Sequence, residues 1–392
     1  LVYYEMLDIE TFKIVEQLKC QRILLHASEG VLGDYDKILD YKGKWYDKIL
    51  TSSRTMLEKF KNVRTGVVGV GSMGQNHARV YSEISNLVAV SDSDSKQGKK
   101  IANRFDVAFF ENYREMFDKV EAISIAVPTF LHLEVAKAAL EAGVNVLVEK
   151  PLASSIEESI SIIRTARKFK RVLSVGHIER HNPVVDYLKK SLEKEEYEKP
   201  ITLSTRRVSS LPTRIRDVGV VYDLAIHDLD ILRYLSGSEA VTVYAIGGQA
   251  NSIKYEDYCS ILIKFANGIT GFSEVNWLTP MKVRQLEITS MDYFIRSDYS
   301  EQSVEILSSE YSNLDDSNLY SANLDIRKEI VNIEKEEPLK REISDFLSSI
   351  INNHAPKVTG EDGLRAMIIA NAVLKSIETE SKINLDLEFQ AL

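Results

Sequence analysis

Three glycines at fixed spacing near residue 70 restrict the possible folds of this chain more than any other feature. They overlap the end of a short apolar run, Thr65-Gly-Val-Val-Gly-Val70, which has the composition of a strand buried on both faces of a parallel sheet. Gly69, Gly71 and Gly74 then open a stretch with helical spacing that continues to about Ile84. A strand, a glycine-rich turn and a helix in this order predict the first unit of a doubly wound α/β sheet.

Strand-like and helix-like stretches alternate over the residues that follow. Apolar runs typical of buried strands lie at residues 86–91, 121–127, 145–149 and 171–175. Stretches with helical periodicity lie between them, at residues 95–105, 131–142 and 155–168. This alternation is typical of a parallel sheet with right-handed crossover helices. It predicts a Rossmann-type, doubly wound parallel sheet over residues 63–181.

The pattern changes after Pro183. Asn267-Gly268 stands between two alternating apolar runs and is a strong signal for a β-hairpin. Further strand patterns lie at residues 201–208, 241–248, 257–266, 269–277, 283–290 and 292–297, and helical patterns at about 184–195, 221–235, 339–352 and 361–379. Successive hairpins predict an α+β domain over residues 182–392 with a large, mostly antiparallel open sheet. The expected fold class is therefore α/β, with two different domains.

The bulk composition excludes several classes of function. The 392 residues suffice for two or three domains, and the net charge of −9 argues against nucleic acid as a partner, since that binding requires a basic face. No apolar run approaches the roughly 18 residues that span a bilayer. Cys20 and Cys259 form no zinc-binding pair. We therefore expect a cytoplasmic protein without a metal site, and we assign no function to residues 1–62, an N-terminal extension in which residues 8–19 predict an amphipathic helix.

The glycine spacing predicts a dinucleotide-binding site. The first glycine permits a tight turn, the second lets the backbone approach a pyrophosphate, and the third lets the helix pack on the strand. Free N–H groups at the helix N-terminus, where Ser72 and Met73 lie, favour phosphate binding. Asp92 ends the second strand, where its carboxylate can bind ribose hydroxyls and repel a 2′-phosphate, and Ser93 follows in place of an arginine. This favours NAD over NADP, although Asp92 could instead cap the next turn.

Two further polar groups are candidates for chemistry. Glu149-Lys150-Pro151 follows a predicted parallel strand at its carboxyl end, where ligands bind in open α/β sheets. The bond before the proline can be cis, which would direct the Lys150 side chain sharply, but Lys150 could also be a solvated loop residue. Asp223 and His227 stand four residues apart on one face of a predicted helix. The histidine can move protons near neutral pH or be a capped structural residue, and a metal site would need a third ligand.

Together these three motifs resemble the signatures of the glucose–fructose oxidoreductase/inositol dehydrogenase (Gfo/Idh/MocA) family, from about Arg64 to Lys382. The resemblance implies that Lys150 binds the reacting hydroxyl beside the nicotinamide, that His227 is the general base, and that Asp223 orients the substrate or the histidine. It implies a cofactor-binding set of Gly69, Gly71, Ser72, Met73, Gly74, Asp92, Pro128, Thr129, His132, Glu149 and Lys150. For His132 a packing role is equally compatible with the sequence.

Polar stretches around the domain junction narrow the choice of substrate. Residues 176–183, 206–207, 214–219, 274–280 and 282–284 resemble the branch of the family that contains UDP-N-acetylglucosamine 3-dehydrogenases. Arginines can bind a pyrophosphate with paired hydrogen bonds, although they could instead form ion pairs between domains. Trp277 could pack on a sugar or support the core. The expected substrate-binding residues are Glu179, Arg180, Asn182, Arg214, Arg216, Asp223 and Trp277.

The resemblance implies NAD-dependent oxidation of a sugar hydroxyl, with C3 of UDP-N-acetylglucosamine as the favoured position. Inositol or another sugar or polyol is one alternative. UDP-N-acetylglucosaminuronate is another, and Arg180 could bind its extra carboxylate. A dinucleotide-sensing regulator is a hypothesis of a different class, but it predicts that Lys150 or His227 is missing, and both are present. Members of the family typically assemble through the open face of the second domain's sheet, which implies a homodimer or homotetramer.

Overall fold

The computed structural model describes residues 58–211, 218–251, 254–312 and 323–385, and the chain divides into two units after Asn62. The predicted helix at residues 8–19 lies outside the described ranges. Both sheets belong to the unit that begins at Val63. No helix within the described ranges combines the length and the apolar character that crossing a membrane requires.

The first sheet is a six-stranded parallel sheet with the order β3-β2-β1-β4-β5-β6. Its strands are β1 (Arg64–Val68), β2 (Asn86–Ser91), β3 (Ala108–Phe110), β4 (Ala122–Ile125), β5 (Asn145–Glu149) and β6 (Leu173–Gly176). The strand order reverses between β1 and β4, and open α/β sheets bind ligands at such a reversal. The predicted doubly wound sheet is confirmed, while β3 was missed because three residues give no periodic pattern.

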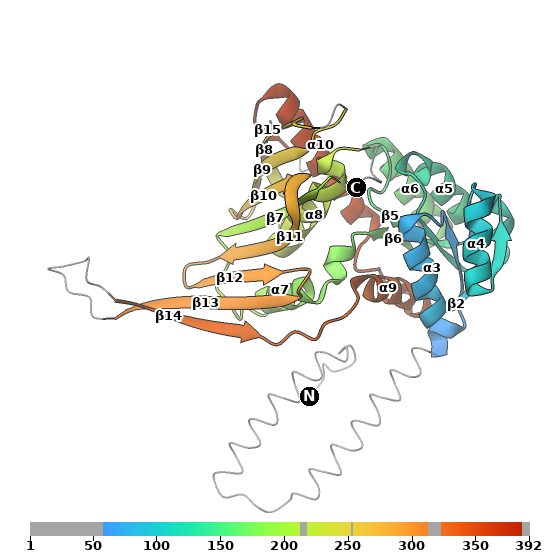
Figure 1. Cartoon of the computed structure of the whole chain (residues 1–392), viewed down its shortest axis with the longest axis horizontal. Helices are drawn as coiled ribbons and strands as arrows, with labels where there is room; N and C mark the ends of the chain where they lie inside the picture. The colour runs from blue at the N-terminus through green and yellow to red at the C-terminus, as the bar shows by residue number, and fades with distance from the viewer. Residues whose placement is uncertain (1–57, 212–217, 252–253, 313–322, 386–392) are drawn as a thin grey trace, which may run out of the picture. The chain divides into compact units, whose positions relative to one another are not determined.

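Helices flank this sheet: α3 (Ser72–Ile84), α4 (Ser95–Phe105), α5 (His132–Glu141) and α6 (Ile156–Phe169), with short 3₁₀ turns η1 (Tyr113–Met116) and η2 (Thr129–Leu131). Figure 1 shows them around the strands in blue to green. Because helices cover both faces, the central strands are mostly apolar, and Val67, Ile123 and Val146 are completely buried. Short polar side chains start two of the helices: Asp94 caps α4 and Ser155 caps α6.

The second sheet has nine strands in the order β14-β13-β12-β11-β7-β10-β9-β8-β15, and only the β7–β10 pair among them is parallel. The strands are β7 (Thr202–Ser210), β8 (Ala240–Gly248), β9 (Tyr258–Phe265), β10 (Thr270–Asn276), β11 (Leu278–Thr289), β12 (Tyr293–Asp298), β13 (Ser303–Ser312), β14 (Asn323–Val331) and β15 (Ile383–Asn384). This confirms the predicted, mostly antiparallel sheet. Strict alternation of exposed and buried residues along β9 shows that one face is covered and the other open.

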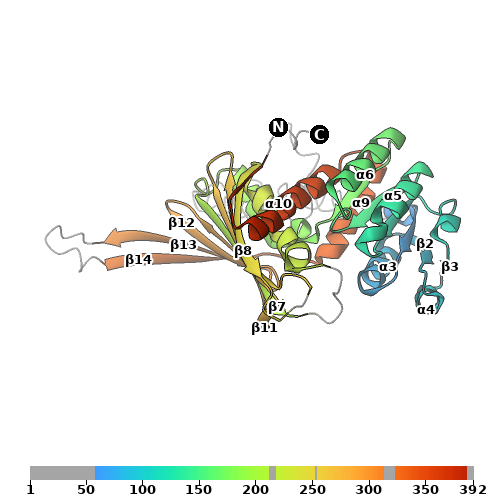
Figure 2. The same ribbon diagram turned by 90° about the horizontal axis from the view of Figure 1, so that it is seen from above.

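The prediction missed β13 and β14, which extend as a ribbon beyond the other strands (Figures 1 and 2). Residues 325–330 of β14 are all exposed, so the strand has no buried face to impose an apolar alternation. The covered face of the sheet carries α7 (Pro183–Glu193), the π-helical turn η4 (Val221–Ala225) and α8 (Ile226–Ser236). The η4–α8 run follows the sequence-predicted helix at about 221–235.

The C-terminal helices α9 (Pro338–Asn352) and α10 (Gly360–Thr379) connect the two sheets. Figure 2 shows α10 between the second sheet and α6, in agreement with its contacts to β8, α8 and α6. Leu364 and Met367 belong to the apolar core of the first sheet, whereas Ile369 and Val373 belong to that of the second. The domain boundary at residue 182 remains a prediction, and the structure adds that α10 contributes to both cores.

Candidate active site

The turn between β1 and α3 is built by its glycines. Gly69 has φ +83°, a left-handed conformation that glycine adopts without steric cost. A Cβ atom on Gly74 would lie 1.8 Å from the carbonyl oxygen of Gly69, so glycine is required for α3 to begin this close to the strand. A Cβ on Gly71 would meet nothing within 4 Å, and no side chain caps the start of α3. The exposed turn, with Ser72 and Met73 in its first helical positions, therefore fits the pyrophosphate of a dinucleotide.

Asp92 follows β2 beside this turn. Its two carboxylate oxygens each accept a backbone hydrogen bond of 2.8 Å, Oδ2 from Val70 N and Oδ1 from Asp94 N. The bond from Asp94 N caps the following turn, as the alternative interpretation of Asp92 predicts. The bond from Val70 N holds the carboxylate against the glycine turn. Asp92 is only half-buried, so its oxygens can accept further bonds from ribose hydroxyls, and Ser93 beside it is exposed.

Lys150 connects the two domains. It follows β5 at the carboxyl end of the parallel sheet, and the Lys150–Pro151 bond is cis. Its Nζ donates to the backbone carbonyl oxygen of Asp223 at 2.8 Å and lies 3.3 Å from Asp223 Oδ1. Asp223 belongs to η4, and π-helical turns occur frequently at functional sites. The two side chains retain 17% and 13% of their exposure, so both can still meet a ligand.

His227 lies in the first turn of α8, directly after η4. Burial lowers the pKa of its imidazole well below 6.5, and the positive charges of Lys150 and Arg207 lower it further. Its Nδ1 is buried and has no hydrogen-bond partner within the described ranges. The ring of His177 lies edge-on to it, with 6.5 Å between centroids. At neutral pH His227 is therefore uncharged and able to accept a proton.

A buried histidine that the sequence analysis missed positions Glu149. His77, on the buried face of α3, lies 2.8 Å from Glu149 Oε1 through Nε2 and 2.9 Å from Ser124 Oγ through Nδ1. Glu149 Oε2 accepts from Lys150 N at 3.2 Å. Burial alone would raise the pKa of Glu149, but the hydrogen bond with His77 and the charge of Lys150 lower it overall. The sequence signal that could have identified His77 is its position three residues after Gly74.

His132 has a structural environment. It is 1% exposed, and its ring nitrogens lie 2.9 Å from Pro151 O and 3.0 Å from Val127 O. Burial lowers its pKa. The ring thus ties the loop that contains Pro128 and Thr129 to the loop after Lys150. This placement favours the packing alternative over direct contact with the cofactor.

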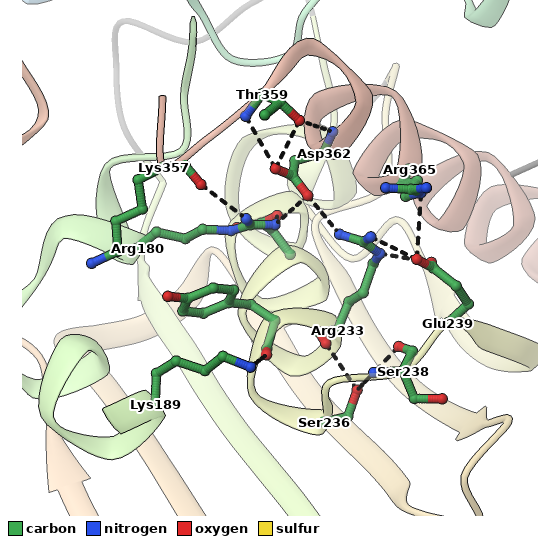
Figure 3. A network of polar contacts seen from close by, with 12 residues as sticks. Arg180, Lys189, Arg233, Ser236, Ser238, Glu239, Lys357, Thr359, Asp362 and Arg365 are labelled. Atoms are coloured by element: carbon green, nitrogen blue, oxygen red, sulfur yellow. Dashed lines mark hydrogen bonds and ion pairs between the residues drawn. The ribbon is translucent and has the colours of Figure 1, made fainter. Parts of the chain in front are cut away.

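Arg180 is in a buried ion-pair network. Its guanidinium donates to both carboxylate oxygens of Asp230, at 2.7 and 2.6 Å, and lies 3.2 Å from Asp362, with 3% of the side chain exposed. Figure 3 shows Arg180 and Arg233 both directed toward Asp362. This placement favours the ion-pair alternative for Arg180 over the expected substrate role, because protein carboxylates accept hydrogen bonds from its guanidinium.

The other expected substrate residues fall into three groups. Asn182 is 2% exposed and caps α7, and Trp277 is 5% exposed in the core of the second domain, so both support the structure. Glu179 retains 16% exposure and accepts from Arg207 Nη1 at 2.8 Å. Asp223 is at the site, whereas Arg214 and Arg216 lie outside the described residues.

A pair of inward-facing arginines was not among the expected site residues. Arg207 on β7 and Arg284 on β11 are direct partners in the strand register. Arg207 donates to Asp228 and Glu179, whereas the acceptors of Arg284 among the described residues are the backbone oxygens of Val208 and Val283. Burial and the charge of Arg207 lower the pKa of Arg284 to about 10. The sequence shows that both positions are arginines, but it does not give the strand register that pairs them.

Comparisons with known proteins give the family of this chain. The Gfo/Idh/MocA oxidoreductase family, NAD-binding Rossmann fold, matches residues 63–177, and the C-terminal α/β domain of the same family matches residues 214–385. UDP-N-acetylglucosamine 3-dehydrogenase of Acidithiobacillus ferrooxidans is 30% identical over 317 residues, which cover 81% of this chain and 98% of that protein. Myo-inositol 2-dehydrogenase of Thermotoga maritima is 23% identical over 342 residues, with 83% and 99% covered.

Solved structures show the same fold. A structure of the Acidithiobacillus ferrooxidans enzyme matches with a TM-score of 0.73 and covers 81% of this chain and 98% of its own. Levoglucosan dehydrogenase in complex with NADH and levoglucosan is 22% identical and matches with a TM-score of 0.71, covering 82% and 99%. Fold, glycine turn and comparisons together define an NAD-dependent oxidoreductase. The chain belongs to the Gfo/Idh/MocA family.

Proposed function

We propose that this chain uses NAD to oxidise a secondary hydroxyl group of a sugar, and that the reacting position is C3 of UDP-N-acetylglucosamine. The observation that carries the redox assignment is the 2.8 Å contact from Lys150 Nζ to Asp223 O, one helical turn before His227. It brings a cation, a carboxylate and a neutral imidazole to the carboxyl end of the parallel sheet. The choice of sugar rests on the 30% identity to the Acidithiobacillus ferrooxidans enzyme.

In this proposal the cofactor is bound at the switch point of the first sheet. The backbone of Gly69–Gly74 holds the pyrophosphate, Asp92 accepts from the ribose hydroxyls, and the loop of Pro128 and Thr129 lies alongside. Bound NAD supplies the hydride acceptor. His132 and Glu149 act through other groups: His132 holds the Pro128 loop, and Glu149 holds the Lys150 backbone.

The chain's own residues bind the reacting hydroxyl and remove its proton. Lys150 donates a hydrogen bond to the hydroxyl oxygen and stabilises the negative charge that develops there. His227 accepts the proton, because its lowered pKa keeps the imidazole neutral at physiological pH. Asp223 holds the ammonium of Lys150 in place and can accept from a neighbouring sugar hydroxyl.

We also propose that copies of the chain assemble through the open face of the second sheet. Tyr244, Leu262 and Phe272 are direct neighbours across β8, β9 and β10, and each is more than one-third exposed. Ile246 on the same face is 60% exposed. A contiguous exposed apolar row of this kind is typical of a protein–protein interface.

NADH formation with a panel of sugars tests the function. The purified chain is mixed with NAD and with UDP-N-acetylglucosamine, UDP-N-acetylglucosaminuronate, free N-acetylglucosamine or myo-inositol, and NADH is followed by absorbance. We expect the highest kcat/KM with UDP-N-acetylglucosamine. Turnover of myo-inositol alone would refute the nucleotide-sugar assignment but preserve the redox assignment, and no turnover of any CH–OH substrate would refute both.

A further inference from the structure

Two arginine side chains face each other on the covered side of the second sheet, beside the catalytic helix. Arg284 on β11 lies directly opposite Arg207 on β7, and like charges in this arrangement repel. Arg207 is neutralised by Asp228 and Glu179, at 2.7 and 2.8 Å. Arg284 has only the carbonyl oxygens of Val208 and Val283 as hydrogen-bond acceptors within the described ranges. Among the described residues, no carboxylate is thus hydrogen-bonded to this half-buried guanidinium, although the charges of Asp228, Glu179 and Asp223 act on it from further away.

Two buried hydrogen-bond donors without acceptors in the described part of the chain belong to Arg207 and to Tyr299, which contacts both arginines. Arg207 is 5% exposed, yet its Nη2 has no hydrogen-bond partner within the described part of the chain. The same is true of the hydroxyl group of Tyr299, which is 4% exposed. Tyr299 N donates to Arg284 O at 2.9 Å, and the Arg207 guanidinium lies 5.4 Å from the centre of the Tyr299 ring. Polar groups left unpaired in this way are costly, so a cluster of them indicates a ligand.

This cluster lies next to the proposed reaction centre. Arg207 donates to Asp228, the residue after His227, and the charges of Arg207 and Arg284 both contribute to the lowered pKa of His227. The charge of Asp223 in turn acts on Arg284. A ligand bound by the arginine pair would therefore be part of the molecule that Lys150 and His227 act on.

We infer that Arg207, Arg284 and the Tyr299 hydroxyl form a subsite for an anionic group of the substrate, with Arg284 as its principal ligand. An oxyanion supplies the acceptors that these donors lack and a negative charge in direct contact with Arg284. The anion is either a sugar carboxylate or a phosphate of a nucleotide sugar, since both accept paired hydrogen bonds from arginine. The inference rests on the proposed sugar oxidation and deepens it, because a neutral polyol would leave the cluster unpaired.

Equilibrium dialysis of the NADH-bound full chain tests this subsite without requiring turnover. The probes are uridine diphosphate, which carries phosphates, and glucuronate, which carries a carboxylate. We expect the wild type to bind at least one probe, and the probe that binds identifies the anion. Arg284→Met should weaken that binding by about 10- to 100-fold, the usual loss for a charged hydrogen bond. Arg284→Lys should weaken it less, because the charge remains while the paired geometry is lost.

A matched control and two contrary outcomes complete the test. Arg296→Met removes an arginine from β12 that is 51% exposed and faces Glu287, and it should leave probe binding unchanged. Retained NADH binding shows that a variant is folded. If Arg284→Met does not bind NADH, the test of the subsite rests on probe binding by Arg284→Lys. Wild-type protein that binds neither probe, or Arg284 variants that bind as tightly as wild type, would overturn the subsite. Sugar oxidation that fails while probe binding depends on Arg284 would refute the proposed function alone.

Discussion

The ammonium nitrogen of Lys150 lies 2.8 Å from the backbone carbonyl oxygen of Asp223, and this contact joins the residue after β5 in one domain to the π-helical turn η4 of the other. Glu149 accepts a hydrogen bond from the backbone N of Lys150 and is itself hydrogen-bonded to His77. Asp223 lies in a π-helical turn that leads into α8 and His227. The proposed reaction centre therefore exists only when both domains are folded and packed. Its groups are separated by more than 70 residues in the chain.

Replacement of Lys150 tests the role of its ammonium group. Lys150→Ala should lower kcat by about 100-fold or more, because it removes the donor that stabilises the developing negative charge. NAD binding, followed by fluorescence titration, should survive, since the glycine turn is unchanged. Lys119→Ala, at an exposed lysine paired with Asp118, serves as the control and should behave as wild type. Turnover by Lys150→Ala at the wild-type rate would show that the role assigned to Lys150 is wrong.

The pH dependence of kcat/KM reports on His227. A general base must be unprotonated, and burial with the nearby charges of Lys150 and Arg207 lowers the pKa of this imidazole well below 6.5. Activity should therefore stay constant as pH falls through neutrality and decline only below pH 6.5, where the base becomes protonated. His354→Gln, outside the site, should leave the profile unchanged. An acid limb centred above pH 6.5 that persists in His227→Ala would contradict the assignment.

Asp92 should determine the choice of cofactor. Asp92→Ala removes an acceptor for the ribose hydroxyls and a charge that repels a 2′-phosphate. The KM for NAD should rise by about 10-fold or more, and the ratio of kcat/KM for NADP to that for NAD should increase. Asp94→Ala removes the N-cap of α4 two residues away, so it should cost about 1 kcal/mol of stability without changing the preference. An unchanged ratio in Asp92→Ala would remove Asp92 from the site.

Glu342 makes stability depend on pH. Its carboxyl group is 1% exposed, both oxygens lack partners within the described ranges, and burial together with the charges of Glu149 and Asp345 raises its pKa well above 4.5. The folded chain thus holds a proton that the unfolded chain has released, so the free energy of unfolding falls as pH rises from about 4.5 toward the raised pKa.

Urea unfolding of Glu342→Gln measures this effect. The amide cannot ionise, so the variant should gain stability relative to wild type as the buffer changes from mildly acidic to mildly alkaline. Glu141→Gln, at an exposed position, should follow the wild-type curve throughout. A stability difference between Glu342→Gln and wild type that is the same at both pH values would show that Glu342 does not titrate as expected.

Leu262 lies in the middle of the exposed apolar row and should contribute to assembly. Leu262→Glu places a charge between Tyr244 and Phe272, and burying that charge against a second copy would be unfavourable. Light scattering should show a smaller species than wild type. Lys119→Glu, at an exposed position of the first domain, provides a control for the charge itself and should leave the mass unchanged. A wild-type mass for Leu262→Glu would place the interface elsewhere.

Local sequence signals predict much of the first domain. The spacing of Gly69, Gly71 and Gly74 depends on backbone geometry alone, and the structure meets it with φ +83° at Gly69 and close packing at Gly74. Strands β2 and β5 and helix α4 begin and end at the predicted residues. Each is bounded by a polar cap or a turn, which are signals carried by neighbouring residues.

The environment of the site could not be predicted, because it depends on long-range contacts. Arg180 looks like a ligand in sequence, yet its partners Asp230 and Asp362 lie 50 and more residues away. Arg284 becomes prominent only because the strand register places it opposite Arg207. Single arginines carry no sequence pattern that separates a buried ion pair from a binding group.

Transfer of deuterium from a labelled sugar shows which carbon gives its hydride to NAD. UDP-N-acetylglucosamine with deuterium at C3 is incubated with the wild-type chain and NAD, and the reduced cofactor is analysed by mass spectrometry. We expect reduced cofactor that carries one deuterium from this substrate, and reduced cofactor without deuterium from substrate labelled only at C4. Unlabelled NADH from the C3-labelled sugar, or no reduction of NAD, would contradict it.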